Sequence, residues 1–231
     1  MIRRAMIFAA GRGERLRPLT DATPKPLLRA GGKMLIEHHL EKLAAAGVEE
    51  VVINTSHLAE QFPAALGDGT RWGLRIRYSY EGPQPMETGG GVRHALPLLG
   101  AQPFIGVSAD IISDFDYASL PEDPPGLAHL VMVPNPAFHP RGDFWLDKGL
   151  LNEDGVGERL TFGNIGVYRP ELVAAETAMR FKLLPIYQRA IREQKLGGER
   201  YDGFWRNIGT ATDLAELDSV FSDRSTSTQI R

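Results

Sequence analysis

Apolar runs and helix-like spacings alternate along the first half of the chain. Short apolar runs occupy residues 5–9, 51–54 and 103–108. Between the first two runs, apolar residues recur every three or four positions over residues 35–44, and Gly47 follows where a helix would end. This alternation of strand and helix patterns predicts a parallel sheet whose two faces are both covered by helices.

Weaker patterns complete this half of the chain. Residues 57–66 have helical spacing but contain Pro63, and residues 91–99 predict a short helix. Apolar and polar residues alternate over residues 74–80, which is typical of a strand with one solvated face. These elements fit the same layered arrangement, and together they predict an α/β fold.

The pattern changes after Asp116. Apolar residues over 127–133 and 160–168 predict two further strands, and residues 144–151 predict a hairpin that turns at Lys148-Gly149. The remaining predicted elements are helices over 170–179 and 184–194, a short strand over 204–208 and a last helix over 212–221. Strands therefore dominate the first part of this half, and helices the last part.

Length and composition fit one domain. The chain has 231 residues, of which 42% are hydrophobic and 24% charged, both ordinary for a globular protein with a full core. With no repeat and no linker, residues 1–221 are predicted to form a single domain. Residues 222–231 are polar, and we expect them to form a disordered tail.

Charge and cysteine content exclude several classes of function. The net charge is −3, so the chain as a whole does not attract nucleic acid or anionic membranes, and any anion site has to be local. The absence of cysteine excludes disulfides, thiolate catalysis and cysteine-ligated metal sites. The six histidines are scattered without metal-binding spacing, and we expect them to be surface or core residues.

Neither a leader nor a membrane segment is expected. The first ten residues are too short for a signal peptide and run directly into glycine and arginine. No stretch approaches the roughly 20 apolar residues that a membrane-spanning helix needs. We therefore expect a cytoplasmic protein with no membrane partner.

Positive charge gathers on the segment that follows the first predicted strand. Residues 12–29 contain five basic side chains against two acidic ones, a local excess of three positive charges in an acidic chain. Gly11 and Gly13 lack a Cβ atom, which lets the backbone approach a ligand closely. Backbone N–H groups and arginine side chains are the groups that bind phosphate oxygens. The segment is predicted to bind a phosphorylated ligand, the alternative being a solvated basic loop.

The common phosphate-loop motifs do not describe this segment. A Walker loop requires G-x-x-x-x-G-K-[ST], which is absent, and Leu16 stands where a Rossmann fingerprint has its third glycine. Pro18, Pro24 and Pro26 are expected to stiffen the segment and to deny it helical structure.

Five stretches together resemble the sugar-1-phosphate nucleotidyltransferases. They are AAGRGERLRPLT with TPKPL (9–27), METGGGVRHAL (86–96), VSADIISDFD (107–116), HPRGDF (139–144) and WRNIGTATDLAEL (205–217). The resemblance extends to about residue 221. It implies a Rossmann-like, mostly parallel mixed sheet sandwiched by helices, of the GT-A-like nucleotidyltransferase type, with a small sugar-binding lobe.

The resemblance also implies an activity. Members of this family join a sugar 1-phosphate to a nucleoside triphosphate and release pyrophosphate. The short C-terminus and the E-T-G-G-G stretch are most similar to uridylyltransferases that act on N-acetylmuramate 1-phosphate in peptidoglycan recycling. The resemblance to mannose-1-phosphate guanylyltransferases is weaker. The implied partners are UTP and a sugar 1-phosphate rather than nucleic acid, and the implied assembly is a monomer or weak homo-oligomer.

The resemblance assigns nucleotide-binding and catalytic roles to particular residues. Arg15 and Lys25 bind and neutralise the phosphates, and with Asp110 they are the implied catalytic residues. The implied nucleotide-binding set is Ala10, Gly11, Gly13, Arg15, Lys25, Glu81, Gly89 and Gly90. A run of three glycines before a helix favours close approach to a flat base, with Glu81 and Glu87 nearby, over the alternative of a flexible turn.

A magnesium site and an acceptor site complete the expected centre. Asp110 follows the third buried strand, at the sheet edge where α/β folds bind ligands, and a carboxylate beside triphosphate suits Mg²⁺. A turn or N-cap role is the alternative for this aspartate. The resemblance adds Asn207 as the second metal residue and assigns the acceptor sugar to Gly142, Asp143, Asn164 and Gly166.

Three departures from the family pattern affect the expected activity. Asn207 replaces an aspartate, Ala109 replaces a glycine, and a Glu-Lys pair that meets the sugar phosphate in longer relatives cannot be placed. Asparagine offers a neutral carbonyl where aspartate brings a charge, so Mg²⁺ should bind more weakly. One alternative is therefore a nucleotide- or sugar-binding homologue with weakened catalysis. Another is a plain α/β domain whose basic loop contacts proteins.

Overall fold

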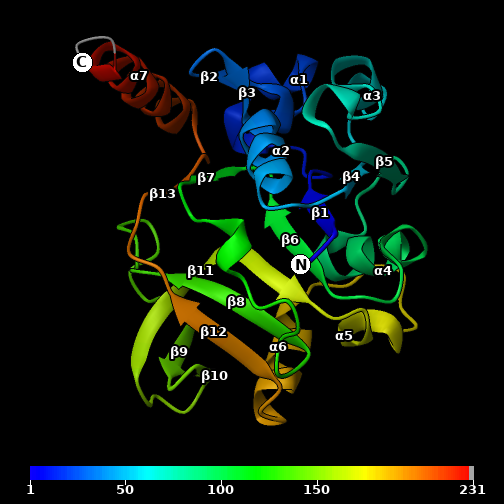
Figure 1. The fold of residues 1–231 in the computed structure, drawn as a ribbon, viewed down its shortest axis with the longest axis vertical. Coiled ribbons are helices and arrows are strands. Elements are labelled where there is room, and N and C mark those ends of the chain that lie inside the picture. Colours follow the sequence, from blue (N-terminus) through cyan, green and yellow to red (C-terminus); the bar gives the residue numbers. More distant parts are fainter. Residues whose placement is uncertain (229–231) are drawn as a thin grey trace.

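A nine-stranded mixed sheet runs through the molecule (Figure 1). The computed structural model describes the backbone of residues 1–228 and the side chains of residues 1–221. In spatial order the strands are β5 (Arg75–Tyr80), β4 (Glu50–Thr55), β1 (Arg4–Phe8), β6 (Phe104–Ser108), β11 (Glu158–Tyr168), β8 (Ala128–Val133), β12 (Leu196–Arg200), β10 (Leu150–Asn152) and β9 (Phe144–Asp147). The expected α/β fold with a mostly parallel N-terminal half is confirmed.

The four strands β5, β4, β1 and β6 are parallel to one another. Their registers pair Ala5 with Val51 on one side and with Ile105 on the other. All of β4 is buried, which is the pattern of a strand covered on both faces. Since parallel strands end at the same edge, the carboxyl ends of β1, β4 and β6 lie together, and β11 then joins β6 in the antiparallel direction.

Helices cover both faces of this sheet. On one face α2 (Leu35–Ala45) and α3 (Gln61–Leu66) pack on alternate residues of β1 and β4. On the other face the packing helices are α4 (Glu87–Leu99), α5 (Glu171–Ala174) and α6 (Leu184–Arg192). α3 begins later than predicted, and its Pro63 lies in the first turn, where a missing N–H leaves no intrahelical bond unmade.

The strands after residue 127 build a lobe at the lower end of the molecule in Figure 1. The β9–β10 hairpin turns at Lys148 and Gly149, both with positive φ, as its sequence predicts. β12 was not predicted, because Gly197 and Gly198 give it low strand propensity. A Cβ on either glycine would press on neighbours across the sheet. Because glycine has no side chain, the strand fits between β8 and β10.

The helix predicted over residues 170–179 is wrong beyond its first turn. α5 ends at Ala174, and the following segment runs along the start of α4. Phe181 O there accepts hydrogen bonds from the backbone N–H groups of Gly89 and Gly90 at 2.9 and 3.0 Å. The backbone of this segment is therefore committed to tertiary hydrogen bonds rather than to a helix.

The proline-rich basic segment contains helical turns, contrary to the prediction. Its elements are η1 (Glu14–Leu16), α1 (Leu19–Ala22) and η2 (Lys25–Leu27). Pro18 is the N-cap of α1, and Pro26 lies at the start of η2. Proline is compatible with these positions because a helix has no acceptor for its first N–H groups.

Two small sheets and two further turns complete the fold. β2 (Arg29–Ala30) pairs with β3 (Lys33–Met34), and β7 (Ile111–Ser113) pairs with β13 (Trp205–Asn207). The predicted strand near residue 204 therefore exists, but it lies outside the nine-stranded sheet. The remaining short helices are η3 (Thr70–Trp72), where Arg71 stacks over Trp72, and η4 (Tyr117–Ser119).

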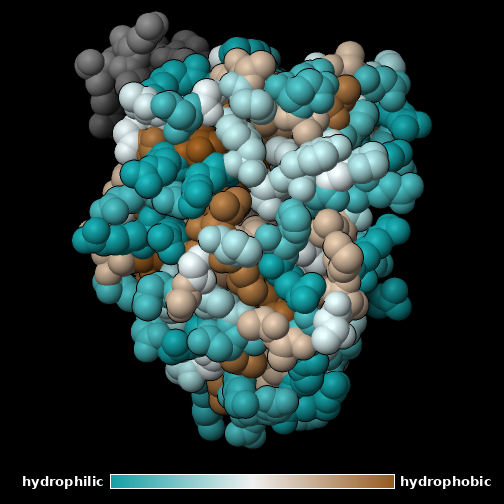
Figure 2. All heavy atoms as spheres, turned by 90° about the vertical axis from the view of Figure 1, so that its right-hand side faces the viewer, coloured by the Kyte–Doolittle hydropathy of each residue, from teal (hydrophilic) through white to brown (hydrophobic). Residues whose placement is uncertain are grey.

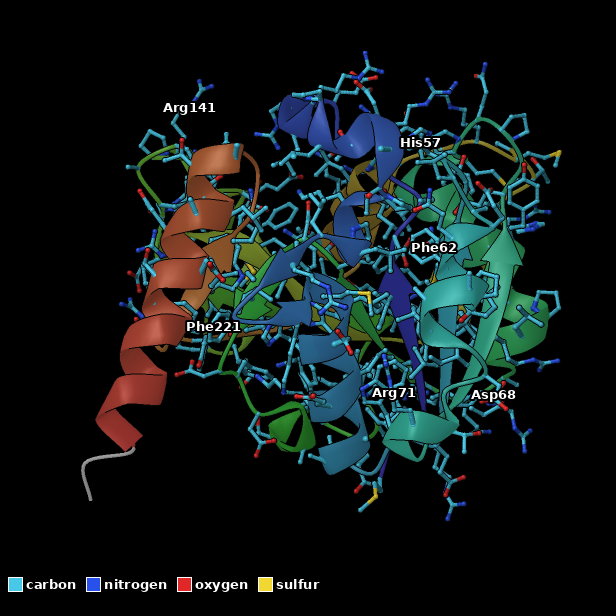
Figure 3. All side chains as sticks on the ribbon, turned by 90° about the horizontal axis from the view of Figure 1, so that it is seen from above. His57, Phe62, Asp68, Arg71, Arg141 and Phe221 are labelled. Carbon is cyan, nitrogen blue, oxygen red and sulfur yellow. The ribbon has the colours of Figure 1, made fainter. Side chains whose placement is uncertain are left out.

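The last helix, α7 (Ala211–Thr228), continues past its predicted end at residue 221. The backbone of residues 222–228 thus belongs to this helix, the expected disorder of the tail stays a prediction, and residues 229–231 lie outside the described part of the chain. Seen from above in Figure 3, α7 runs along the side of the molecule, and Phe221 lies toward the β2–β3 hairpin. Phe221 stacks on His38, with ring centroids 4.8 Å apart, and a helix anchored there extends without a new nucleation step.

Among the described helices, none is both long and apolar enough to cross a bilayer. The face shown in Figure 2 is largely hydrophilic, with the most hydrophobic side chains in a broken strip that runs from the upper left down toward the lower end. Few large apolar side chains are strongly exposed there or elsewhere in the described chain, which is ordinary for a protein surface.

His39 on α2 gives the fold a pH-dependent stability. Burial lowers the pKa of its imidazole from 6.5 to about 4, because desolvation disfavours the charged ring. Nδ1 lies 2.9 Å from the Tyr117 hydroxyl, and Nε2 has no hydrogen-bond partner. The unfolded chain takes up this proton first as pH falls, so the folded state is fully favoured above pH 6.5 and loses stability toward pH 4, by up to about 1.4 kcal/mol per pH unit.

We expect urea unfolding of the wild type to show a steeper loss of stability between pH 6.5 and 4.5 than His39→Gln shows. The glutamine variant cannot take up this proton, so the difference between the two slopes isolates one histidine from the carboxylates that titrate nearby. His94→Gln, at an exposed position, is the matched control and should keep the wild-type slope. Equal slopes in the wild type and His39→Gln would contradict the prediction.

Candidate functional site

A cavity of about 730 Å³ opens at the carboxyl ends of β1, β4 and β6. Phe8, Asn54 and Ser108, each at or near the end of one of these strands, line its floor. Ligands of open α/β sheets bind at this edge, where the strand order reverses. Here β1 lies between β4 and β6, so the crossovers diverge at the cavity.

The glycine- and arginine-rich segment forms one wall of the cavity. All five of the predicted residues in this segment line it, namely Ala10, Gly11, Gly13, Arg15 and Lys25. Gly13 has φ of 64°, and a Cβ there would lie 2.9 Å from Thr20 Cγ2, so this position requires glycine. Arg15 reaches Gly209, which also lines the cavity, and a Cβ added at Gly209 would lie 3.2 Å from Arg15 Nη1. Cationic groups and free backbone thus face the same space, which suits an anionic ligand.

Lys25 and Asp110 form an ion pair inside this cavity. Lys25 Nζ donates to Asp110 Oδ2 at 2.9 Å, and the lysine side chain is only 9% exposed against 37% for the aspartate. A nearly buried ammonium group is costly to desolvate and needs an anionic neighbour. The pair places one fixed positive charge on the cavity wall, next to a carboxylate that still reaches solvent.

Asp110 and Asn207 lie side by side although the sequence separates them widely. Asn207 pairs with Ile111 across β13 and β7, and Ile208 N donates to Asp110 O at 2.8 Å. Asp110 lines the first cavity, and Asn207 lines a second one next to it. Among the described residues, no group of three His, Cys, Asp or Glu side chains forms a metal cage. Mg²⁺ accepts one or two protein oxygens when phosphates and water supply the rest, so this pair fits a site that a bound triphosphate would complete.

The glycine run lies against a segment distant in the sequence. Gly89 and Gly90 are inside the first turn of α4, and the cavity is lined there by Glu87 and Thr88. A Cβ on Gly89 would lie 2.4 Å from Phe181, and one on Gly90 would lie 2.3 Å from Met179 O. These glycines let the segment before α6 pack against α4, and their approach to a base stays a prediction. The sequence contained no sign of this distant packing partner.

Glu81 lines the cavity but is nearly buried. Its Oε1 accepts a hydrogen bond from Asn54 Nδ2 and its Oε2 accepts one from Met86 N, both at 2.6 Å. Both carboxylate oxygens are therefore committed to the protein. Glu81 therefore lies in the cavity wall, and its contacts hold that wall together.

A second cavity of about 380 Å³ adjoins the first. Phe8, Thr88 and Ser108 line both cavities, so the two spaces meet at these residues. Aromatic rings make up much of the second wall, namely Phe8, Phe138, Phe144, Phe162, Tyr168, Tyr187 and Trp205. No lysine or arginine of the described chain lines it. Aromatic faces with a few polar groups are typical of a small-molecule site.

Two of the four residues predicted for the acceptor line this second cavity. Asp143 accepts hydrogen bonds from Phe162 N at 2.8 Å and from His139 Nε2 at 3.1 Å, which fixes its carboxylate. Asn164 has φ of 58° at an irregularity in the pairing of β11 with β8, and such irregularities redirect side chains. Its side chain joins Asp143 in the cavity wall.

Gly142 and Gly166 serve the fold instead of lining the cavity. A Cβ on Gly142 would lie 2.5 Å from Asn135 Oδ1, and one on Gly166 would lie 2.7 Å from His129 O. Both glycines are thus needed for close backbone packing next to Asp143 and Asn164. Their role as direct contacts to the acceptor sugar stays a prediction.

Sequence reasoning missed His139 and the aromatic wall. His139 was counted among scattered histidines, although its position four residues before Asp143 in HPRGDF was an available signal. The rings of Phe162, Tyr187 and Trp205 come from β11, α6 and β13. Apolar residues in strands and helices predict a core, and only the tertiary arrangement shows that these line a cavity.

Comparison with known proteins fits this geometry. The sequence model of the family described as Nucleotidyl transferase matches residues 4–123. The chain is 44% identical over 227 residues to N-acetylmuramate alpha-1-phosphate uridylyltransferase of Neisseria meningitidis serogroup B, covering 94% of this chain and 97% of that protein. It is 39% identical over 116 residues to mannose-1-phosphate guanylyltransferase of Mycobacterium tuberculosis, covering 50% of this chain and 32% of that protein.

The fold has a close counterpart among solved structures. A putative glucose-1-phosphate thymidylyltransferase from Bacillus anthracis superposes with a TM-score of 0.83, and the match covers 95% of each chain. The two sequences are 18% identical, so this likeness concerns the fold alone.

Proposed function

The chain belongs to the nucleotidyl transferase family as a sugar-1-phosphate nucleotidyltransferase, and from that premise we propose that it joins UTP to N-acetylmuramate 1-phosphate. The products are UDP-N-acetylmuramic acid and pyrophosphate. The observation that carries the proposal is the pair of adjoining cavities, one with a cationic glycine-rich wall and one with an aromatic wall. A nucleoside triphosphate suits the first cavity and a substituted sugar suits the second.

The reaction needs positioning and charge more than a protein nucleophile. A phosphate oxygen of the sugar 1-phosphate attacks the α-phosphorus of the triphosphate, and the bond from that phosphorus to the bridging oxygen breaks. The electron pair leaves with pyrophosphate. Two anions approach each other in this step, so cations that face the reacting groups lower its barrier. Arg15 and the Gly11–Gly13 backbone hold the phosphates that leave, and Lys25 meets the charge around the α-phosphate.

Asp110 and Asn207 would hold one Mg²⁺ beside the triphosphate. The ion supplies charge neutralisation at the phosphate oxygens when bound. One carboxylate and one amide carbonyl make a weaker protein site than two carboxylates, so the nucleotide has to carry much of the metal. Lys25, already paired with Asp110 at 2.9 Å, keeps that carboxylate oriented toward the cavity.

The second cavity favours an acceptor with acyl or ether substituents. N-acetylmuramate carries an N-acetyl methyl and a lactyl ether with a methyl group and a carboxylate, whereas mannose carries only hydroxyls. Phe138 and Leu184 line this cavity and remain 66% and 50% exposed, so they offer apolar surface to such substituents. Because no lysine or arginine of the described chain lines this cavity, both anionic groups of the acceptor belong at its edges: the 1-phosphate at the boundary with the first cavity, near Thr88 and Ser108, and the lactyl carboxylate toward solvent.

The working unit that we propose is a single domain over residues 1–221, acting in the cytoplasm as a monomer or weak homo-oligomer. The nine-stranded sheet joins the lobe to the parallel half without a linker, which supports one unit. The largely hydrophilic face in Figure 2 gives no broad apolar surface for a permanent partner on that side.

Pyrophosphate release over a matrix of substrates tests the proposal. The purified protein is given UTP, GTP, CTP or dTTP with N-acetylmuramate 1-phosphate, N-acetylglucosamine 1-phosphate or mannose 1-phosphate, in excess Mg²⁺. We expect kcat/KM for UTP with N-acetylmuramate 1-phosphate to exceed that of every other pair by roughly 100-fold. A preference for GTP with mannose 1-phosphate would overturn the uridylyl assignment. Thermal stabilisation by nucleotide without turnover would indicate a binding protein that has lost catalysis.

A further inference from the structure

A chain of three hydrogen bonds, two of them buried and one partly buried, links two walls of the first cavity. Ala9 N donates to Asn54 Oδ1 at 2.7 Å, and Asn54 Nδ2 donates to Glu81 Oε1 at 2.6 Å. Met86 N donates to Glu81 Oε2 at 2.6 Å. Asn54 is 4% exposed and Glu81 is 5% exposed, so water cannot replace these partners freely.

The direction of every bond in this chain is fixed. The two ends are backbone N–H groups, which can only donate. Asn54 therefore has to present its carbonyl oxygen to Ala9, which leaves its amide NH₂ for Glu81. Glu81 then has to accept at both oxygens, which an ionised carboxylate does and a glutamine cannot.

The hydrogen-bond chain connects the glycine- and arginine-rich wall of the cavity to residues 82–86, which begin another wall. Ala9 immediately precedes the Ala10–Gly13 stretch, and Met86 is the N-cap of α4, next to the cavity residues Gln84 and Pro85. Residues 82–86 make three further hydrogen bonds: Ser56 Oγ donates to Gly82 O at 2.8 Å, Arg12 donates to Pro83 O at 3.4 Å, and Phe181 N donates to Met86 O at 3.2 Å.

Gly91, the third glycine of the run, lies against the same hydrogen-bond chain. A Cβ at Gly91 would lie 2.4 Å from Glu81 Oε1 and 3.0 Å from Asn54 Nδ2. Glycine at this position leaves room for the Asn54–Glu81 contact on the first turns of α4. The third glycine therefore accommodates the hydrogen-bond chain, while the first two accommodate the segment before α6.

We propose that Asn54 and Glu81 are positioning residues that hold segment 82–86 in the place where it contacts the nucleobase. The proposal rests on the proposed function, in which the wall with Arg15 and Lys25 binds the triphosphate. The nucleoside then lies against the wall formed by Gln84 and Pro85. The Gln84 side chain can both donate and accept hydrogen bonds, as the edge of a base requires. Glu81 acts through this segment and makes no contact with the nucleotide itself.

A swap of the two polar groups tests this inference. In Asn54→Asp, two carboxylates face each other, and in Glu81→Gln, an amide NH₂ faces either Asn54 Nδ2 or Met86 N. The double variant Asn54→Asp with Glu81→Gln restores all three bonds. The new carboxylate at position 54 accepts from Ala9 N and from the new amide NH₂ at position 81, whose carbonyl oxygen accepts from Met86 N. The double variant also keeps the wild-type charge.

We expect each single variant to weaken nucleotide binding by roughly tenfold and to reduce the preference for UTP over the other triphosphates. The double variant should recover both to within about threefold of the wild type. The KM of the sugar 1-phosphate should stay nearly constant throughout. Binding is measured by calorimetry and discrimination by kcat/KM, with melting temperatures recorded for all four proteins. Glu60→Gln, at an exposed position, is the control for the loss of one carboxylate.

The possible outcomes separate this inference from the proposed function. Single variants that lower the melting temperature but leave nucleotide affinity and base preference unchanged would show a purely structural role. Weakened binding that the double variant does not recover would show that Glu81 contacts the nucleotide directly. A wild type that binds GTP in place of UTP overturns the uridylyl assignment, while the same variants measured with GTP still test the hydrogen-bond chain. A wild type that binds no nucleotide overturns both.

Discussion

Lys25→Ala is expected to lower kcat for pyrophosphate release by about 10²- to 10³-fold. The ammonium group is held on the cavity wall with 9% exposure, where a charge interacts more strongly with the reacting phosphates than it would in water. Its removal has a second effect, because Asp110 loses the partner 2.9 Å away and leaves an unpaired negative charge beside the triphosphate. Both effects raise the barrier for the approach of two anions.

Steady-state kinetics with both substrates saturating measure this loss, and the melting temperature shows whether the fold survives. Lys33→Ala is the matched control, since Lys33 forms an exposed ion pair with Glu41 at 2.7 Å, away from the cavity. Exposed pairs of this kind contribute little, so we expect less than about a twofold change in kcat. If Lys25→Ala changed only the KM of the triphosphate, the lysine would serve ground-state binding and not the transferred phosphate.

The parallel half of the fold could be predicted because its signals are local. The strands at residues 5–9, 51–54 and 103–108 are short apolar runs, and the helix between the first two carries its periodicity in its own sequence. Each element is buried on the faces that its pattern indicates. From this order of elements, the position of Asp110 at a ligand-binding edge followed directly.

The lobe and the wall of the second cavity could not be predicted in the same way. β12 exists because Gly197 and Gly198 fit between two other strands, and neither glycine favours a strand by itself. Likewise the first two glycines of α4 pack against Phe181 and Met179, which lie far along the chain. Where the reason for a residue is a partner distant in sequence, the residue pattern alone gives an incomplete interpretation or none.

Helical structure in the basic segment was missed for a different reason. The pattern of Pro18, Pro24 and Pro26 predicts a segment without helix, although proline is tolerated at the start of one. The error concerned secondary structure and left the site intact, because the same turns direct Gly13, Arg15 and Lys25 into the cavity. The resemblance to the family supplied these residues, and the structure shows why their spacing brings them together.

Asp110→Asn is expected to cost about 10² in kcat even at high Mg²⁺, because the one carboxylate at the proposed metal site is lost. The amide keeps an oxygen that can accept from Lys25 Nζ, so the change removes charge with little change of shape. The β7–β13 pairing places Asp110 and Asn207 next to each other. A carboxylate at position 207, on β13, could therefore supply the negative charge that Asp110 supplies. We therefore expect Asn207→Asp to reduce the Mg²⁺ concentration for half-maximal activity by roughly tenfold.

The double variant Asp110→Asn with Asn207→Asp moves the carboxylate from one strand to the other. A Mg²⁺ titration of turnover for the wild type, both single variants and the double variant measures how far the two positions are interchangeable. Partial recovery in the double variant, above Asp110→Asn alone, is the expected result, since one negative charge is restored next to the triphosphate. Asp114→Asn, on the far end of the same strand pair and hydrogen-bonded to Tyr201, controls for a general loss of acidic charge. If Asn207→Asp left the Mg²⁺ requirement unchanged, residue 207 would not hold the ion, and Asp110 with the nucleotide would have to hold it alone.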